Sequence, residues 1–295
     1  MKCLFEGSGT ALSTPFTENG VNQSVFKQLI EFQVKNGCDA AIVCGTTGEP
    51  STMTAQEKQT AIEVCVDTVN GRVPVVAGTG GNHTTKVIED SLIAQKIGAD
   101  ALLVVTPYYN RCTQKGLIAH YSALADAVAL PIIAYNVPSR TGVNMLPETM
   151  AALAEHPNIY GTKEASGNIS QITKLCALCA DKIAIYSGND DHIVPMLSVG
   201  AVGVISVMGN IIPQVMHDMV ALYKRGDIQG SRALQLGALE LCAALFCEVN
   251  PIPIKMALTL MGFNMGSPRL PLTPLESGHV DYLKQAMVNY GLTLA

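Results

Sequence analysis

The sequence predicts an α/β fold, a closed (β/α)8 TIM barrel followed by a C-terminal helical appendage. Short apolar segments alternate with polar loops and amphipathic helices between residues 9 and 207. Most of these segments are continuous apolar runs, which is typical of parallel strands buried on both faces. Eight such units in roughly 200 residues fall near the lower end of the size range of these barrels. The predicted strands are Gly9–Leu12, Ala40–Cys44, Val73–Ala77, Ala101–Val105, Ile132–Tyr135, Ile159–Thr162, Ile183–Tyr186 and Gly203–Val207.

The helices between these strands have recognisable ends. Thr54 and Glu57 form the pattern of a capping box, which predicts the start of one helix. Gly37, Gly71 and Gly98 each follow a helix and precede a strand, as expected of glycines that end helices in the left-handed conformation.

An internal resemblance supports the repeated unit. Residues 36–43 and 96–104 share a Gly-x-Asp-Ala junction between helix and strand, and residues 197–204 repeat it loosely. A doubly wound sheet would instead need a Gly-x-Gly-x-x-Gly sequence after its first strand. The nearest candidate, Gly78–Gly81, lies on the third unit and has His83 in place of the last glycine. The barrel is therefore favoured.

The strand pattern stops after about residue 225. Three helical stretches follow, at residues 227–247, 252–262 and 275–292. Thr273–Glu276, with proline at the first helical position, predicts the start of the last one. We therefore divide the chain into a barrel catalytic domain, residues 1–225, and a C-terminal three-helix region, residues 226–295.

Composition limits the possible partners and the location. The chain has 295 residues, 48% hydrophobic and 15% charged, with a net charge of -5. No cluster of Lys and Arg occurs, which argues against nucleic acid as a partner. No apolar run is long enough to span a membrane, and no signal peptide is present, so we expect a cytoplasmic protein with no membrane contact. The nine cysteines lie in apolar segments, which fits a reducing compartment.

The segment Ile159–Gly167 is the candidate centre of the chemistry. Lys163 closes a short apolar strand there, just before small and polar residues that must turn the chain. Apolar surroundings disfavour the charged ammonium and lower its pKa from a reference value near ~10.4. The neutral amine is a nucleophile toward ketones. The alternative interpretation is a lysine that extends its ammonium to the surface at a strand end.

Polar residues at other strand ends favour the catalytic interpretation. A barrel enzyme builds its site at the carboxyl ends of its strands, so these side chains should meet beside Lys163. Hydroxyls and backbone N–H groups in the Gly45–Glu49 turn could hold a carboxylate. The other polar residues are Thr106, Tyr108, Tyr109, Tyr135, Arg140, Thr141 and those of the Ser187–Asp190 segment.

Metal and cofactor signatures are weak. The six histidines are dispersed, with no His-x-His or His-x-x-x-His pair. The cluster Asp190–His192 is better explained by the dipole at a helix start. Cys176 and Cys179 have the spacing of a redox or zinc pair, but no second pair follows. We expect no metal and no cofactor, which favours a Schiff-base aldolase over a metal-dependent one.

Five motifs in the same order resemble the dihydrodipicolinate synthase family, and the resemblance covers essentially the whole chain. They are Gly45–Glu49, Thr106–Arg111, Tyr135–Gly142, Gly161–Ala165 and Asn250–Lys255. The resemblance implies a pyruvate-dependent class I aldolase, a lyase. Such an enzyme would condense pyruvate with L-aspartate 4-semialdehyde, in the first committed step toward diaminopimelate and lysine.

The family pattern also implies the catalytic roles. Lys163 would form the imine with pyruvate, and Tyr135 would shuttle protons that Thr47 relays to Tyr109. In the family, that last tyrosine projects into the site of a neighbouring subunit. The resemblance therefore implies a homotetramer built from dimers.

Substrate-binding roles follow in the same way. Thr46 and Thr47 would hold the carboxylate of pyruvate, and Arg140 would hold the carboxylate of the semialdehyde. A planar guanidinium binds a carboxylate through two parallel hydrogen bonds, which supports this role. Gly188 and Ile205 match positions whose backbone carbonyls shape the site in the family.

Two other classes of function stay open. N-acetylneuraminate lyases, 2-keto-3-deoxy sugar-acid aldolases and hydroxy-oxoglutarate aldolases share the lysine and the tyrosine, but Arg140 suits a four-carbon acid-aldehyde better than a polyol chain. A non-catalytic ligand-sensing barrel would explain Arg140, but not the presence of Lys163, Tyr135 and Tyr109 together.

One regulatory feature departs from the family pattern. In members that lysine inhibits, histidines after the Gly-Thr-Thr-Gly-Glu turn and a glutamate after the Gly-Thr-Gly motif meet the effector. The matching residues here are Ala55, Lys58 and Lys86, whereas Asn82 and Tyr108 are kept. We expect an enzyme that L-lysine does not inhibit, or inhibits only weakly.

Overall fold

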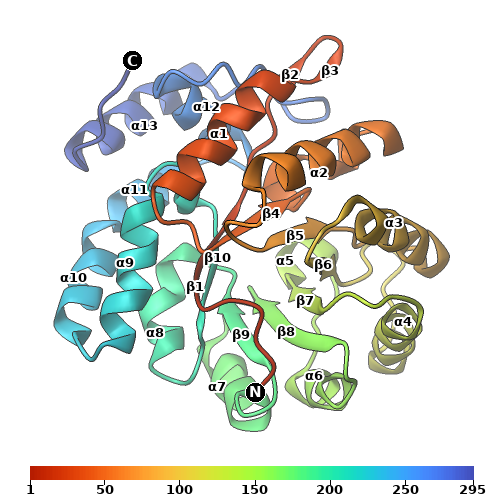
Figure 1. The fold of residues 1–295 in the computed structure, drawn as a ribbon. Helices are drawn as coiled ribbons and strands as arrows, with labels where there is room; N and C mark the ends of the chain where they lie inside the picture. The colour runs from red at the N-terminus through yellow and green to blue at the C-terminus, as the bar shows by residue number, and fades with distance from the viewer.

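The computed structural model describes residues 1–295 and forms a closed barrel of parallel strands (Figure 1). Each of the eight predicted strands overlaps one strand of the barrel, so the predicted fold class is confirmed. The order around the barrel is β1-β10-β9-β8-β7-β6-β5-β4. The bounds are β1 (Gly7–Ala11), β4 (Ala40–Val43), β5 (Val75–Gly78), β6 (Ala101–Val105), β7 (Ile132–Asn136), β8 (Ile159–Glu164), β9 (Ala184–Ser187) and β10 (Gly203–Ser206).

Helices surround the barrel, and their predicted ends are confirmed at several places. The Thr54 hydroxyl accepts from Glu57 N at 3.2 Å, and the Glu57 carboxylate accepts from Thr54 N at 2.8 Å, which completes the capping box. Gly37, Gly71 and Gly98 all have positive φ. The helices are α1 (Gln23–Lys35), α2 (Ala55–Val69), α3 (Thr84–Ile97), α4 (Gln114–Ala127), α5 (Pro138–Thr141), α6 (Pro147–Ala154), α7 (Ile169–Cys179), α8 (Ile193–Leu197) and α9 (Pro213–Lys224). Short 3-10 turns are η1 (Thr46–Gly48), η2 (Pro50–Thr52), η3 (Asp190–His192) and η4 (Met208–Asn210).

Two apolar layers hold the barrel together. One lies between the strands and the surrounding helices, and the other fills the barrel interior. In the interior, the rings of Phe5 and Tyr186 stack with centroids 4.5 Å apart. The Tyr186 hydroxyl donates to Phe5 O at 2.7 Å, so the buried phenol keeps a partner. This packing closes the interior where the N-terminal segment enters.

A short hairpin precedes α1 and was not predicted. Its strands are β2 (Phe16–Thr17) and β3 (Gly20–Val21). Two residues are too few for a strand pattern to appear in a sequence. Phe16 N donates to Met265 O at 2.9 Å, which joins the hairpin to the C-terminal region.

The C-terminal region corrects two predicted boundaries. The stretch 227–247 forms two helices instead of one, α10 (Ile228–Gly237) and α11 (Leu239–Leu245), and Gly237 at the break is a poor helix former. They are followed by α12 (Ile252–Leu260) and α13 (Ser277–Asn289). The prediction that Thr273–Glu276 starts the last helix, with Pro274 at its first position, is wrong, because α13 begins at Ser277.

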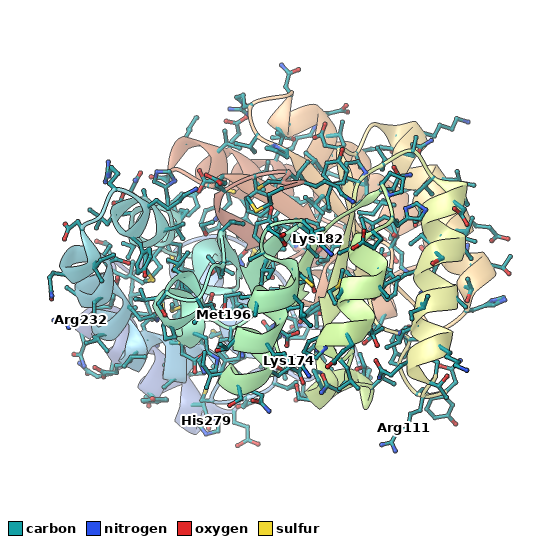
Figure 2. All side chains as sticks on the ribbon, turned by 90° about the horizontal axis from the view of Figure 1, so that it is seen from below. Arg111, Lys174, Lys182, Met196, Arg232 and His279 are labelled. Atoms are coloured by element: carbon teal, nitrogen blue, oxygen red, sulfur yellow. The ribbon has the colours of Figure 1, made fainter.

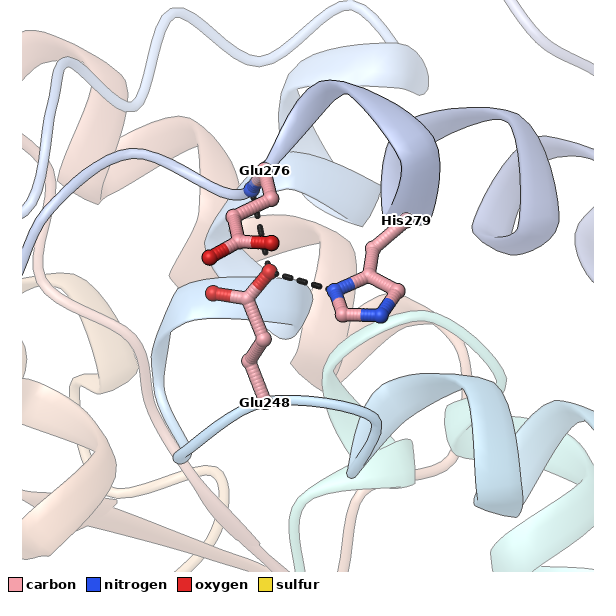
Figure 3. A group of neighbouring side chains, drawn as sticks. All are labelled: Glu248, Glu276 and His279. Carbon is pink, nitrogen blue, oxygen red and sulfur yellow. Dashed lines mark hydrogen bonds and ion pairs between the residues drawn. The ribbon is translucent and has the colours of Figure 1, made fainter.

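A carboxylate distant in sequence holds the start of α13 (Figure 3). The side chain of Glu248 accepts from Glu276 N at 3.0 Å and from His279 Nδ1 at 2.7 Å. Anions stabilise the N-terminal turn of a helix. The hydrogen bond with His279 also lowers the pKa of Glu248.

The C-terminal helices reach the edge of the barrel where the strands end. In the side view of Figure 2, Arg111 from the loop after β6 and His279 from α13 lie at the same edge of the molecule. The predicted boundary between residues 225 and 226 falls in the turn between α9 and α10. The division into two domains stays a prediction. No helix of the chain has the length and apolar character needed to cross a bilayer.

Candidate functional site

Lys163 and Tyr135 face each other on neighbouring strands. They are paired in the register of β7 and β8, and Lys163 Nζ lies 4.5 Å from the centroid of the Tyr135 ring. Both side chains are buried. The face of the Tyr135 ring therefore lies against the amine, at the place where a carboxylate would stand in an ion pair.

Burial weakens the positive charge on Lys163. It lowers the pKa of the amine to about 8, the nearby Arg140 guanidinium acts in the same direction, and Asp190 opposes both. At pH 7 an amine with that pKa is neutral in roughly a tenth of the molecules, which is roughly 300 times the fraction for an ordinary lysine. A nucleophilic amine is thus available near neutral pH.

Tyr135 keeps its proton near neutral pH. Burial raises the pKa of the phenol above its usual value, whereas Arg140 and the Thr46 hydroxyl oppose that rise. A protonated phenol can donate to a developing oxyanion and then recover its proton from a neighbour.

The turn after β4 brings two threonines to the same edge. Its 3-10 turn η1 contains Thr46 and buries Thr47, whose hydroxyl accepts from Asn250 Nδ2 at 3.0 Å. Glu49 ends the turn in the left-handed conformation, with φ 57°. A Cβ on Gly48 would lie 3.2 Å from Leu12 O, so the turn packs closely on β1 and leaves little room for a side chain.

A cavity of about 300 Å³ opens beside these groups. Thr46, Tyr108, Tyr135, Val137 and Arg140 are among the residues that line it. Lys163 does not line this cavity directly, and its amine lies over the ring of Tyr135. The volume suits small ligands with a few precisely placed polar partners.

Gly188 and Ile205 also lie at the end of the barrel where the strands finish. A Cβ on Gly188 would come within 3.2 Å of Lys163 Cε and 2.6 Å of Ala165 Cβ, so only glycine fits beside the lysine. Ile205 is buried on β10 and packs in the barrel interior together with Tyr135.

Tyr109 is a proposed catalytic residue that the single chain does not bring into the site. Its side chain is 90% exposed, its φ is 71°, and it does not line the cavity. The predicted relay from Tyr135 through Thr47 to Tyr109 is therefore incomplete within one chain.

Asp190 also has partners that the sequence did not suggest. Its Oδ2 accepts from Val207 N at 3.0 Å and Met208 N at 2.8 Å, at the end of β10. Asp190 and Asp191 lie in the first turn of η3, as expected of acidic residues at a helix start, although no side chain caps that start. The carboxylate thus also links two strand ends and acts on Lys163 through its charge.

Other candidate metal ligands are engaged in structural bonds. Glu248, Glu276 and His279 have ligand atoms within 4.8 Å of one another, but the Glu248 carboxylate already holds the start of α13. Cys176 and Cys179 are free thiols, and burial raises the pKa of each to about 11. Thiols with such a pKa are poor nucleophiles and poor metal ligands at neutral pH.

Sequence reasoning missed Asn250 as a residue of the site. The motif Asn250–Lys255 is part of the family resemblance, but the sequence alone assigns no role to its members. In the structure, Asn250 contacts Thr47 through its amide, and its backbone O accepts from Arg140 Nη2 at 2.9 Å. The only signal available was a polar residue before two prolines in an otherwise apolar stretch.

The chain is similar to known proteins over nearly its whole length. A model of the dihydrodipicolinate synthetase family matches residues 4–289. A 4-hydroxy-tetrahydrodipicolinate synthase from Caldicellulosiruptor bescii is 54% identical over 292 residues, which are 99% of this chain and 99% of that protein. The crystal structure of the dihydrodipicolinate synthase from Thermotoga maritima has a TM-score of 0.97 and 41% identity, and the match covers 98% of this chain and 100% of that chain.

A dihydrodipicolinate synthase from Cyanidioschyzon merolae with lysine bound is similar over the same length. Its TM-score is 0.96 at 40% identity, and the match covers 99% of this chain and 100% of that chain. Barrel and C-terminal helices are thus both shared with these proteins. The chain belongs to the dihydrodipicolinate synthetase family of enzymes.

Proposed function

We propose that the protein condenses pyruvate with L-aspartate 4-semialdehyde to 4-hydroxy-tetrahydrodipicolinate, through an imine on Lys163. The observation that carries this proposal is the buried Lys163 amine, with its pKa near 8, beside the phenol of Tyr135. The activity printed for the Caldicellulosiruptor relative supports the choice of substrates.

Imine formation needs a neutral amine and a proton carrier. The Lys163 nitrogen attacks the ketone carbon of pyruvate, the carbonyl oxygen leaves as water, and the nitrogen loses two protons in forming the neutral imine. Tyr135 can donate a proton to the departing oxygen. The positive charge of the protonated imine then takes the place of the ammonium over the Tyr135 ring.

The carbon–carbon bond forms in the next step. Loss of a methyl proton from the protonated imine gives an enamine, whose carbon attacks the aldehyde of the second substrate. The amino group of that substrate then replaces Lys163 on the former ketone carbon, because the product contains a ring C=N bond. Each turnover thus returns the free amine.

The two substrate carboxylates have separate partners in this proposal. Thr46 and Thr47 hold the carboxylate of pyruvate near the amine, and Arg140 at the exposed rim holds that of the semialdehyde. Backbone carbonyls at Gly188 and Ile205 shape the space around the lysine. Sister aldolases would give the same imine but accept a different aldehyde.

Reductive trapping tests the proposal directly. Incubation with pyruvate and borohydride should convert the imine to a stable amine, and mass spectrometry should find the adduct on Lys163. Lys255 is a matched internal control, because it is equally buried but paired with Glu49. An adduct on another lysine, or none on Lys163, would contradict the proposed mechanism.

The rate of trapping should rise with pH. Below its pKa, Lys163 carries a proton and cannot attack, so the neutral fraction increases about tenfold per pH unit. With a pKa near 8, that fraction grows by roughly 50-fold between pH 6 and pH 8 and then levels off. The measurement is the initial rate of trapping across this range, with circular dichroism as the control for folding. A flat profile, or a midpoint near the value of a free lysine, would contradict the shifted pKa.

We infer a homotetramer built from dimers, in which Tyr109 completes the site of its neighbour. The exposure of Tyr109 and the adjacent Tyr108, 90% and 40%, supports a subunit contact at this loop. The free cysteines support a cytoplasmic, reducing location for the assembly.

Complementation between two inactive variants tests the shared site. Tyr109→Phe removes the outer hydroxyl, and Lys163→Ala removes the nucleophile. Mixed dimers contain one site with both groups intact, so mixing the variants after reversible dissociation should restore part of the activity. Each variant alone is the control. Verified mixed dimers without any activity would show that the site is self-contained.

We further propose that L-lysine does not inhibit this enzyme, or does so only weakly. Lys58 lines the cavity, and the Lys86 ammonium pairs with Asp90 at 2.7 Å and Glu89 at 3.5 Å. In relatives that lysine inhibits, an acid at the position of Lys86 meets the ammonium of the bound lysine. That position carries a cation here. The neighbouring acid, Asp90, is already engaged by Lys86.

Inhibition should be measured at saturating pyruvate across rising concentrations of L-lysine. The expected rate is unchanged into the millimolar range, because a cation stands where a carboxylate is needed. D-lysine serves as the control for ionic effects. Half-inhibition by L-lysine below the millimolar range would contradict this interpretation of residues 55, 58 and 86.

A further inference from the structure

We propose that Asn250, in the segment between α11 and α12, is a positioning residue that makes the Thr47 hydroxyl a donor toward the substrate carboxylate. The inference rests on the proposed function and adds a residue from outside the barrel to the site. The C-terminal region then takes part in substrate binding in addition to covering the barrel.

Asn250 joins two parts of the site that come from different strand ends. Its Nδ2 donates to Thr47 Oγ1 at 3.0 Å, and its backbone O accepts from Arg140 Nη2 at 2.9 Å. The residue is 6% exposed. One buried residue thus contacts both groups that the proposed function assigns to the two carboxylates.

The direction of the first hydrogen bond determines what Thr47 can do. A threonine hydroxyl has one hydrogen to donate and can accept two. Because Asn250 Nδ2 supplies the hydrogen of this bond, the hydrogen of Thr47 stays available for a carboxylate or a phenolate. A carboxylate in place of the amide would accept the Thr47 hydrogen itself and leave nothing to donate to pyruvate.

The other polar atom of the amide, Oδ1, is buried and makes no hydrogen bond within the chain. An unpaired buried oxygen costs on the order of 1–3 kcal/mol. The amide thus makes its one side-chain hydrogen bond to Thr47, and that bond accounts for a polar side chain at this buried position.

The segment that carries Asn250 is held to the same turn that carries Thr47. Lys255 on α12 pairs with Glu49 at 2.6 Å, and Arg269 N donates to the other oxygen of Glu49 at 3.0 Å. Both side chains of the ion pair are 1% exposed. These contacts fix α12 relative to the turn that contains Thr46 and Thr47, so the amide of Asn250 is positioned within a rigid unit.

The substitution Asn250→Asp isolates the amide, because it keeps the shape and leaves the backbone carbonyl bound to Arg140. We expect the KM for pyruvate to rise at least about tenfold, as for the loss of one hydrogen bond to a charged group. The KM for the semialdehyde should change less than about threefold. Asn250→Ala should have a smaller effect on pyruvate, since Thr47 can still donate.

A double-mutant comparison separates positioning from a general structural role. In a Thr47→Val background, Asn250→Asp should add nothing to the KM for pyruvate, because the hydroxyl on which it acts is gone. Asn158→Asp is the matched control. Its Nδ2 donates to Ala125 O at 3.0 Å and Val128 O at 2.8 Å, beside the start of β8, so its loss should change stability and not the KM for pyruvate.

Trapping with pyruvate and borohydride distinguishes the two levels of the proposal. Failure to trap an adduct in the native protein would contradict the proposed function itself. Normal trapping with an unchanged apparent affinity for pyruvate in Asn250→Asp would overturn only the role of Asn250. Independent, multiplying effects of the Asn250 and Thr47 substitutions would also overturn it. If Asn250→Asp does not fold, Asn250→Ala is compared in the two Thr47 backgrounds: its smaller effect on the KM for pyruvate should disappear in Thr47→Val, and an equal effect in both backgrounds would overturn the role of Asn250.

Discussion

Lys163→Arg is expected to abolish imine formation and to lower kcat/KM by about three orders of magnitude or more, the scale seen when a catalytic nucleophile is removed. The change keeps a positive charge over the Tyr135 ring. An arginine has a pKa above about 12, however, and cannot supply a neutral nitrogen at neutral pH. The fold should be retained, because the replacement stays cationic and similar in length.

The measurement combines turnover with borohydride trapping and a melting curve. Lys182→Arg is the matched control, since Lys182 is a partly exposed lysine that pairs with Glu155. It should have normal turnover and normal trapping. Normal turnover in Lys163→Arg would rule out the Schiff-base mechanism.

Much of the barrel could be predicted because its signals are local. A strand buried on both faces needs a continuous apolar run, and Ala101–Val105 has that pattern within five residues. Gly98 before it has a φ of 106°, which only glycine adopts readily, so its position marks the end of α3. Lys163 could be placed for the same reason, since a charged residue at the end of an apolar strand is conspicuous.

The features that could not be predicted depend on contacts between distant residues. Glu248 determines where α13 begins, although it lies 28 residues before Glu276. Asn250 and Thr47 are 203 residues apart, and no periodicity or spacing relates them. Propensity and turn rules describe neighbours along the chain, so tertiary capping and tertiary hydrogen bonds lie beyond them.

The largest expected effect on stability comes from breaking the buried ion pair between Glu49 and Lys255. Lys255 Nζ lies 2.6 Å from Glu49 Oε1 and 4.2 Å from the centroid of the Phe16 ring. Burial lowers the pKa of Lys255, and Glu49 opposes that shift, so the charged amine depends on its partner. Lys255→Met should reduce the free energy of unfolding by about 3–5 kcal/mol, because it leaves a buried carboxylate without its cation.

The double substitution Lys255→Met with Glu49→Leu should recover part of that loss, because it removes both buried charges. Thermal and denaturant midpoints measure the effect, and Glu148→Gln is the control. Glu148 pairs with Lys174, but both side chains are 58% exposed, so we expect no measurable change in Tm.

The same pair should also affect pyruvate binding, because Glu49 ends the turn that carries Thr46 and Thr47. At temperatures well below the Tm of Lys255→Met the barrel is still folded. There the variant should have a higher KM for pyruvate than the native protein. A normal Tm for Lys255→Met would show that Glu49 finds another partner. A lower Tm with an unchanged KM would show instead that the ion pair stabilises the fold without positioning the turn.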